Sequence, residues 1–169
     1  MAGTSVSAQD RAEITELFAR YAWAGDTGSF DEYVALFTED GVFDGMGGYY
    51  TGPDELRELA REVKQGPRSR GLQHWVGNSV YDSDGPDKVV VKSMCFAPRR
   101  IENEHSLVFV GYYVDTIVRV EGEWKFRIRR WRPWAGEVLD GAKPWETGAD
   151  DGGFIHRKGT ENGARVSAV

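Results

Sequence analysis

Asp26 and His74 are the pair of residues that we consider first as candidates for proton transfer. His74 stands in an apolar, strand-like run, GLQHWVGNSVY. Asp26 lies in a polar break that follows an amphipathic, helix-like stretch beginning at Ile14. A buried imidazole needs a partner for its second nitrogen, and a carboxylate there holds one tautomer and stabilises the imidazolium. We therefore expect the fold to bring Asp26 and His74 together at an apolar pocket, with His74 as a general base.

Each residue of this pair also has a purely structural interpretation. A histidine in a strand is often a satisfied core residue, and Asp26 could simply cap the following helix. His74 has the same strand parity as Leu72, Val76 and Val80. This alternation predicts that all four side chains face the core, which favours the catalytic interpretation of His74.

Three helices are expected ahead of the strand that carries His74. They cover residues 7–24, 29–37 and about 53–63. Gly25 is expected to end the first helix. Ser29 and Glu32 form a capping-box pattern at the start of the second, and Pro53 suits the first turn of the third.

From residue 72 onward the hydrophobic period changes from 3.6 to 2. The predicted strands are 41–44, 49–51, 72–81, 88–100, 106–120 and 123–132. Short turn sequences such as Gly85-Pro86 separate the last four, which indicates an antiparallel meander. Strands this much longer than the usual five or six residues tend to bend. The predicted fold is an α+β cone: three N-terminal helices packed in a strongly curved, mixed, mostly antiparallel sheet.

Composition excludes several classes of function. With 169 residues the chain suits one domain, and a net charge of -6 argues against a nucleic-acid or anionic-membrane surface. No apolar run approaches the roughly 20 residues of a membrane span, and the N-terminus does not resemble a signal peptide, so we expect a cytoplasmic protein. The single cysteine, Cys95, and the three histidines show no metal-ligand spacing. We expect chemistry without a cofactor or metal.

We expect residues 1–6 to be a flexible leader, 7–132 to form the cone domain and 133–169 to form an irregular tail. Trp134 and Trp145 would be unusual in a free tail, so its first part is expected to cover the pocket or a neighbouring subunit. The strands carry more aromatic residues than one core needs. We therefore expect a homo-oligomer, a dimer or trimer, with an interface on the outer sheet face.

The basic sequence RIRRWR at 127–132 offers a cation near the predicted site. Alternation places Arg127 and Arg129 on one face of the strand and Arg130 on the other. A buried guanidinium needs a carboxylate or another anion, because an unpaired buried charge is costly. Asp115 is expected to pair with a neighbouring arginine. The alternation does not decide which arginine faces the pocket.

Five motifs carry a resemblance to a known superfamily. They are YAWAGD at 21–26, SFDEYVALFTEDGVFDG at 29–45, GPDEL at 52–56, QHWVGN at 73–78 and VRVEGEWKFRIRRW at 118–131. Their order resembles the SnoaL-like branch of the nuclear transport factor 2-like superfamily. The acidic residue after the first helix and the histidine in the first long strand resemble its dehydratase and dehydrochlorinase members, namely scytalone dehydratase, bile-acid 7α-dehydratase and hexachlorocyclohexane dehydrochlorinase.

This resemblance implies roles for individual residues. His74 would remove a proton, Asp26 would orient His74, Tyr21 would contribute a hydrogen bond, and Arg129 would stabilise the departing anion. The chain departs from the bile-acid dehydratase at FAPRR (96–100), where that enzyme has a further acidic residue, and a second catalytic histidine has no clear match.

The predicted function is a cofactor-independent lyase that eliminates a small group from a mostly apolar cyclic molecule. The candidate walls of its pocket are aromatic and apolar: Phe43, Tyr49, Trp75, Met94, Phe109 and Tyr113. An isomerase or cyclase with the same base is the first alternative. A non-catalytic ligand-binding or assembly subunit, similar to the β subunits of ring-hydroxylating dioxygenases, is the second. A limonene-epoxide-type hydrolase is disfavoured, because it would need an Asp–Arg–Asp arrangement.

Overall fold

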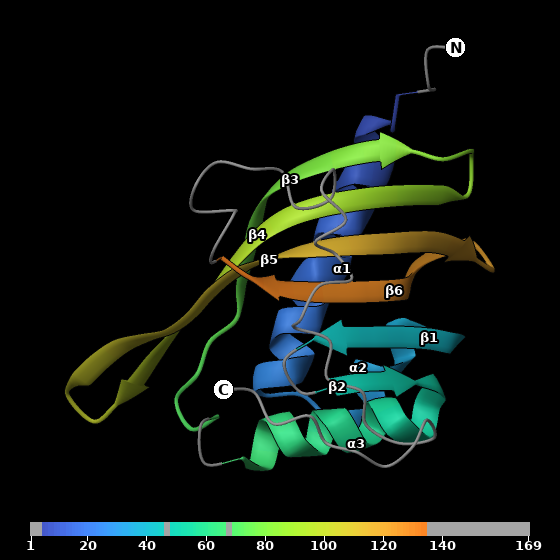
Figure 1. Ribbon diagram of the computed structural model, residues 1–169. Helices are drawn as coiled ribbons and strands as arrows, with labels where there is room; N and C mark the ends of the chain where they lie inside the picture. Colours follow the sequence, from blue (N-terminus) through green and yellow to red (C-terminus); the bar gives the residue numbers. More distant parts are fainter. Residues whose placement is uncertain (1–4, 46–47, 67–68, 135–169) are drawn as a thin grey trace.

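The computed structural model describes residues 5–45, 48–66 and 69–134 (Figure 1). Its helices are α1 (Ala8–Asp26), α2 (Phe30–Ala35) and α3 (Gly52–Gln65). Its strands are β1 (Phe37–Gly45), β2 (Gly48–Thr51), β3 (Trp75–Ser83), β4 (Lys88–Ile101), β5 (Glu104–Val120) and β6 (Glu123–Pro133). The predicted tail beyond Trp134 lies outside the described residues. No helix in the described ranges is long and apolar enough to cross a membrane.

Side chains cap the first two helices, and the cap of the second is the one that the sequence predicts. The Ser7 hydroxyl accepts a hydrogen bond from the backbone N–H of Asp10 at 3.0 Å. At α2 the capping box is complete, because Ser29 accepts from the N–H of Glu32 at 3.1 Å and Glu32 accepts from the N–H of Ser29 at 2.6 Å. These bonds satisfy backbone donors that a helix start leaves without intrahelical partners.

The first helix is longer than predicted. It continues through Gly25, so Asp26 is its last residue and does not lie in a polar break. The helix ends where the N–H of Thr27 binds the carbonyl of Trp23 at 2.9 Å. Glycine inside a helix costs only about 1 kcal/mol relative to alanine. This cost is too small to end a helix whose apolar face is buried.

The second helix is shorter than predicted, because Phe37 already belongs to β1. Phe37 pairs with Phe126 of β6, and this parallel pairing continues through Val42 to Asp44 after a register shift. Phe37 is therefore in a strand because it pairs with β6, although its spacing in the sequence suits a helix.

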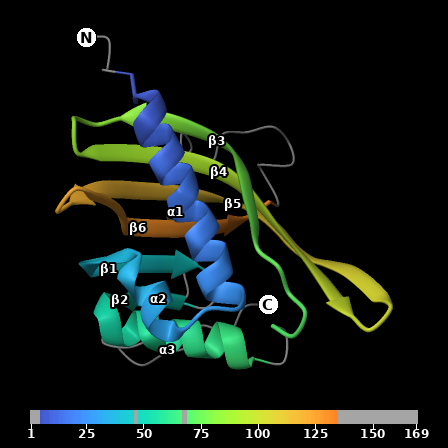
Figure 2. The same ribbon diagram turned by 180° about the vertical axis from the view of Figure 1, so that it is seen from behind.

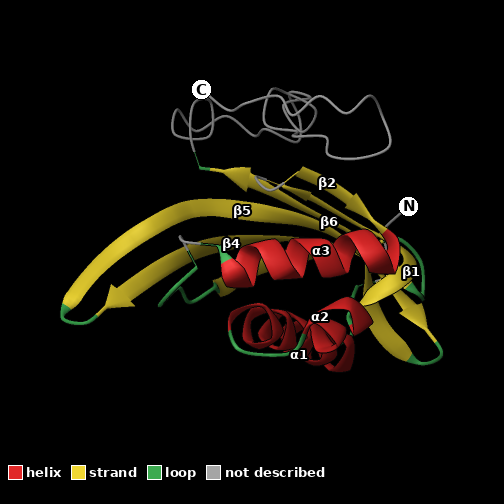
Figure 3. Ribbon diagram, turned by 90° about the horizontal axis from the view of Figure 1, so that it is seen from below, coloured by secondary structure: helices red, strands yellow, loops and turns green. Residues whose placement is uncertain are grey.

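The sheet has the order β2-β1-β6-β5-β4-β3. Only the β1–β6 pair is parallel, and β3 to β6 form the predicted antiparallel meander. The long strands β4 and β5 curve, and the three helices lie on one face of the sheet (Figures 2 and 3). The predicted α+β fold with a mixed, mostly antiparallel sheet is confirmed.

The core lies between the helices and this sheet. Ile14 of α1, Leu56 of α3, and Ile117 and Phe126 of the sheet are completely buried. Val6, inside the segment predicted to be a flexible leader, is also buried and joins the core. The core therefore forms where the helices pack against one face of the sheet.

The strand that was predicted to contain His74 begins later, at Trp75. A register shift between Gly77 and Val80 accompanies a positive φ of 50° at Asn78. Such a bulge reverses the alternation of side chains beyond it. Val80 is therefore 59% exposed, and the prediction that it faces the core is wrong.

Candidate active site

Asp26 and His74 are in direct contact. Oδ1 of Asp26 lies 2.5 Å from Nδ1 of His74, and Oδ2 accepts the backbone N–H of His74 at 2.7 Å. Their side chains are only 14% and 13% exposed. One carboxylate, placed by the last residue of α1, therefore holds both the ring and the backbone of the histidine.

The segment that carries His74 is itself held by β4. The N–H of Gln73 donates to the carbonyl of Pro98, and the N–H of Arg100 donates to the carbonyl of Gly71, both at 3.0 Å. Gly71 has a φ of +73°, and a Cβ there would lie 1.9 Å from the carbonyl oxygen of Arg100. Glycine is required at this close approach, which places His74 against α1.

The contact at Nδ1 determines which nitrogen of His74 can react. A neutral imidazole that donates from Nδ1 to a carboxylate keeps its lone pair on Nε2. Among residues 5–45, 48–66 and 69–134, which the structure describes, none makes a hydrogen bond to Nε2. This nitrogen can therefore accept a proton from a ligand, and Asp26 would stabilise the imidazolium that forms.

His74 lines a cavity of about 100 Å³ between the helices and the sheet. Four of the predicted site residues line it as well: Tyr21, Phe43, Phe109 and Tyr113. The ring of Phe109 lies 5.5 Å from the imidazole, centre to centre. The cavity walls are mostly aromatic and apolar, as a site for an apolar ligand requires.

Three of the predicted wall residues lie elsewhere. Trp75 and Met94 are 55% and 46% exposed and line a separate groove of about 330 Å³, next to Phe96. Trp75 follows His74 directly, and successive strand side chains point to opposite faces. Tyr49 does not line the cavity either, because its neighbour Tyr50 takes the buried position.

Arg129 is also not at the cavity, contrary to the prediction that it meets a departing anion. Its side chain is completely buried and binds Asp115, with Nη1 of Arg129 3.0 Å from Oδ2. Its guanidinium carbon lies 4.0 Å from the ring centre of Tyr21 and 3.6 Å from that of Tyr113. The arginine thus lies behind two rings that line the cavity, and Asp115 pairs with an arginine as predicted.

A bulge explains the position of Arg129. Side chains of β6 alternate regularly up to Phe126, which is buried, and then two half-buried residues follow before Arg129. Arg127 consequently faces outward and pairs with Asp40 at 2.9 Å. The expected common face of Arg127 and Arg129 is therefore wrong.

The cavity also contains hydroxyl donors. Tyr33 donates to the hydroxyl of Tyr21 at 3.3 Å, and both residues line the cavity with Tyr113. Burial raises the pKa of Tyr21, and it raises the pKa of Tyr33 and Tyr113 well above the usual value. All three phenols stay protonated near neutral pH and can donate hydrogen bonds.

Residues 6–130 match the sequence profile of the SnoaL-like domain. The chain belongs to the SnoaL-like domain family. No curated protein matches it.

Solved structures with the SnoaL-like fold are similar over most of their length. Rv3472(D26N), a protein of unknown function from Mycobacterium tuberculosis, has 26% identity and a TM-score of 0.68 over 75% of this chain and 77% of that chain. A candidate scytalone dehydratase from Novosphingobium aromaticivorans has 27% identity and a TM-score of 0.64 over 74% and 84%. A LinA-type3 hexachlorocyclohexane dehydrochlorinase from Novosphingobium barchaimii, at 23% identity, a TM-score of 0.63 and 74% and 86% coverage, shows the fold alone.

Two aromatic wall residues of this SnoaL-like domain did not emerge from the sequence as site candidates. The sequence suggests that Tyr33 is an apolar core residue of α2. Its hydroxyl could have indicated a place in the site, because a buried phenol needs a hydrogen-bond partner. Trp131 lines the cavity and donates from Nε1 to Sγ of Cys95 at 3.2 Å. The sequence places Trp131 on the same strand face as Arg129, but the bulge in β6 determines which face of the strand is buried.

Proposed function

We propose that this chain is a cofactor-independent lyase that acts on a mostly apolar, cyclic small molecule. The observation that carries the proposal is the double contact of Asp26 with His74 beside an aromatic cavity. A histidine held in this way presents a basic Nε2 to a bound ligand. The name of one similar protein, a candidate scytalone dehydratase, refers to an elimination reaction and supports the same class.

The reaction begins with proton transfer from carbon to Nε2 of His74. The electron pair of the broken C–H bond forms a double bond to the adjacent carbon, and a hydroxyl group leaves that carbon with its bonding electrons. The imidazolium of His74 returns the proton to the leaving hydroxyl, so the net change is the loss of water. Asp26 stabilises the imidazolium in the interval.

A hydroxyl donor assists this step. General-base catalysis contributes roughly 10²–10⁴-fold, so stabilisation of developing negative charge must supply much of the remainder. Tyr21 lies at the cavity, and Tyr33 supports it by donating to its hydroxyl. The substrate needs an activating group, such as a ketone, next to the carbon that loses its proton. We propose that Tyr21 donates a hydrogen bond to the oxygen of this group. Arg129 has no contact with the substrate in this mechanism.

The size of the cavity limits how the substrate binds. Its volume of about 100 Å³ is below the roughly 300–1,000 Å³ of ordinary ligand sites. The reacting part of the molecule occupies this space, and the rest extends out past His74, whose side chain is 13% exposed. Phe43, Phe109 and Trp131 provide the apolar contact.

An isomerase or cyclase with the same base is the second candidate. The cluster of tyrosine hydroxyls favours it, because such donors suit an enolate oxygen even when no group leaves. Product mass separates the two reactions, since elimination loses water and isomerisation leaves the mass unchanged.

The test is turnover of a panel of cyclic hydroxy-ketones by wild type, His74→Ala and Asp26→Asn, with products identified by mass spectrometry. His74→Ala should lose at least about two orders of magnitude in rate. His105→Ala is the matched control, because His105 is exposed in the β4–β5 hairpin, and it should keep full activity. If both dyad variants fold and turn over substrate at the wild-type rate, the dyad is structural and the proposal fails.

A further inference from the structure

A second and larger hollow lies away from His74. It is a groove of about 780 Å³ between α1, α2 and the β5–β6 turn. None of its lining residues lines the His74 cavity. Leu17, Ala24 and Trp124, which are at least 90% buried, together with Leu36, form an apolar floor. A groove of this size with an apolar floor has the dimensions of a binding site.

The rim of this groove is acidic. Glu13, Glu16, Glu32 and Glu123 line it, against two cations, Arg20 and Lys125. Glu16 and Arg20 pair with each other at 3.1 Å. Hydrogen bonds from Ser29 lower the pKa of Glu32, so this carboxylate stays ionised well below neutral pH. The rim thus keeps an excess of negative charge.

The end of α1 adds to this negative potential. Ala24, Thr27 and Gly28, at and just beyond the last turn of α1, line the groove. The C-terminal end of a helix carries a partial negative charge, which a basic side chain in the last turn usually offsets. Helix α1 has no basic residue there.

Trp23 completes the groove with an exposed aromatic face. Its side chain is 69% exposed, the largest value among the exposed large hydrophobic residues of the described chain. The face of an indole ring attracts ammonium and guanidinium groups. An exposed tryptophan beside carboxylates is suited to a lysine or arginine side chain.

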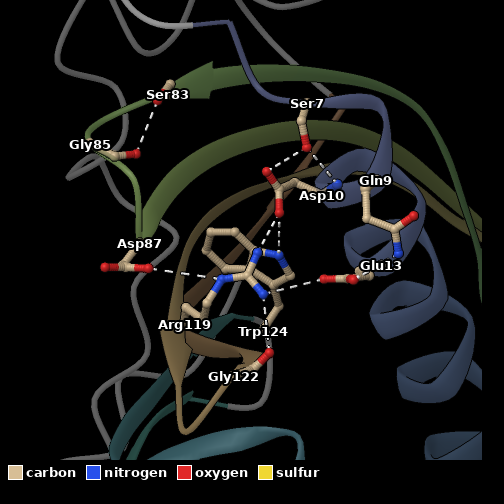
Figure 4. Close-up of polar contacts among 10 residues, drawn as sticks. All are labelled: Ser7, Gln9, Asp10, Glu13, Ser83, Gly85, Asp87, Arg119, Gly122 and Trp124. Atoms are coloured by element: carbon tan, nitrogen blue, oxygen red, sulfur yellow. Dashed lines mark hydrogen bonds and ion pairs between the residues drawn. The ribbon is translucent and has the colours of Figure 1, made fainter.

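Ion pairs and hydrogen bonds connect two of the elements that line the groove. Figure 4 shows Arg119 among Asp10, Glu13, Asp87 and Trp124. Arg119 binds Asp10 and Glu13, donates to the carbonyl of Gly122 at 3.0 Å, and lies 4.3 Å from the ring centre of Trp124. These contacts connect the β5–β6 turn to α1.

We propose that this groove binds a basic amphipathic segment of a partner protein. Lysine or arginine side chains of the segment would lie over Trp23 and the rim glutamates, and its apolar side chains would pack on Leu17 and Leu36. An amphipathic helix in a groove is a common mode of peptide recognition, and here the negative rim complements its charge. The proposal is independent of the chemistry at His74.

The test uses a synthetic amphipathic helical peptide of leucine and lysine, with calorimetric titration into the full chain. The lysine peptide should bind with one-to-one stoichiometry, and more weakly at high salt, whereas a version with glutamate for lysine should not bind. Trp23→Ala should weaken binding about tenfold or more, because both apolar and cation–π contacts are lost. Glu123→Gln should weaken it to a smaller degree.

Matched controls localise the effect. Trp75→Ala removes an exposed tryptophan in the other groove, and Glu104→Gln removes an exposed carboxylate on the β4–β5 hairpin. Neither should change the affinity. The proposal is overturned if the lysine peptide does not bind, if Trp23→Ala binds it as wild type does, or if lysine amide alone binds as tightly as the peptide. His74→Ala should bind the peptide normally, which separates this result from any failure of the lyase.

Discussion

The carboxylate of Asp26 contacts His74 through both of its oxygens, one at ring Nδ1 and one at the backbone N–H. Orientation of the ring and position of the chain therefore depend on a single side chain at the end of α1. An aspartate at this position offers an accepting oxygen to each of the two contacts, whereas an asparagine has one accepting oxygen and one donating nitrogen.

This geometry predicts a change of tautomer in Asp26→Asn. If the amide oxygen keeps the backbone N–H of His74, the amide nitrogen faces Nδ1 and donates to it. Neutral His74 would then carry its proton on Nε2 and lose its basic site, whereas the wild type carries it on Nδ1. Nitrogen NMR of the imidazole measures the tautomer directly. An unchanged Nδ1–H tautomer in the variant would contradict the prediction.

Gly71 is expected to be essential for the position of His74. In Gly71→Ala the new Cβ would lie 1.9 Å from the carbonyl oxygen of Arg100, at a φ of +73°. We expect a loss of roughly 1–3 kcal/mol in the free energy of unfolding, together with reduced turnover, because the segment before β3 must move. Gly77→Ala is the control, since nothing lies within 4 Å of its Cβ. Thermal unfolding of the two variants makes the comparison, and equal stability would count against the prediction.

Asp115 should make stability depend on pH. Burial raises the pKa of its carboxyl from 3.8 to about 7, with Arg129 opposing the rise. Between these two pKa values the folded state holds a proton that the unfolded state has released. The protonated carboxyl therefore contributes its full stabilisation below about pH 4, and this stabilisation is lost as the pH rises through about 7. Relative to that of Asp115→Asn, the free energy of unfolding of the wild type should fall by up to roughly 4 kcal/mol over that range.

Urea unfolding of both proteins at several pH values measures this difference, and the comparison cancels the titration of other carboxyl groups. If wild type instead gains stability relative to Asp115→Asn as the pH rises, Arg129 keeps the carboxylate ionised and the prediction is wrong.

The outer sheet face is expected to form the interface of a homo-oligomer. Trp75 and Phe96 stack there with ring centres 6.0 Å apart, and both are exposed. A charge placed at the centre of such a patch opposes its burial, so Phe96→Asp should convert a dimer or trimer into a monomer. Light scattering at micromolar concentration gives the mass. Val120→Asp, at an exposed position near the β5–β6 turn, should not change it, and a monomeric wild type would refute the interface.

The sequence alone determined the signals that depend on neighbouring residues. Ser29 and Glu32 predicted the start of α2, and the change of period at residue 72 predicted the antiparallel meander. Asp26 was recognisable as the partner of His74 through the resemblance to the SnoaL-like dehydratases, and a buried imidazole needs a carboxylate or an equivalent acceptor.

Only the tertiary structure decided which faces of the strands meet the cavity. Period-2 alternation assigned Val80 to the core and grouped Arg129 with Arg127, and both assignments are wrong because each strand contains a register shift between those positions and the preceding pairs. A bulge arises from pairing with a neighbouring strand, and it reverses every side chain beyond it. Alternation within one strand contains no information about that partner, so the burial of Arg129 behind Tyr21 required the assembled sheet.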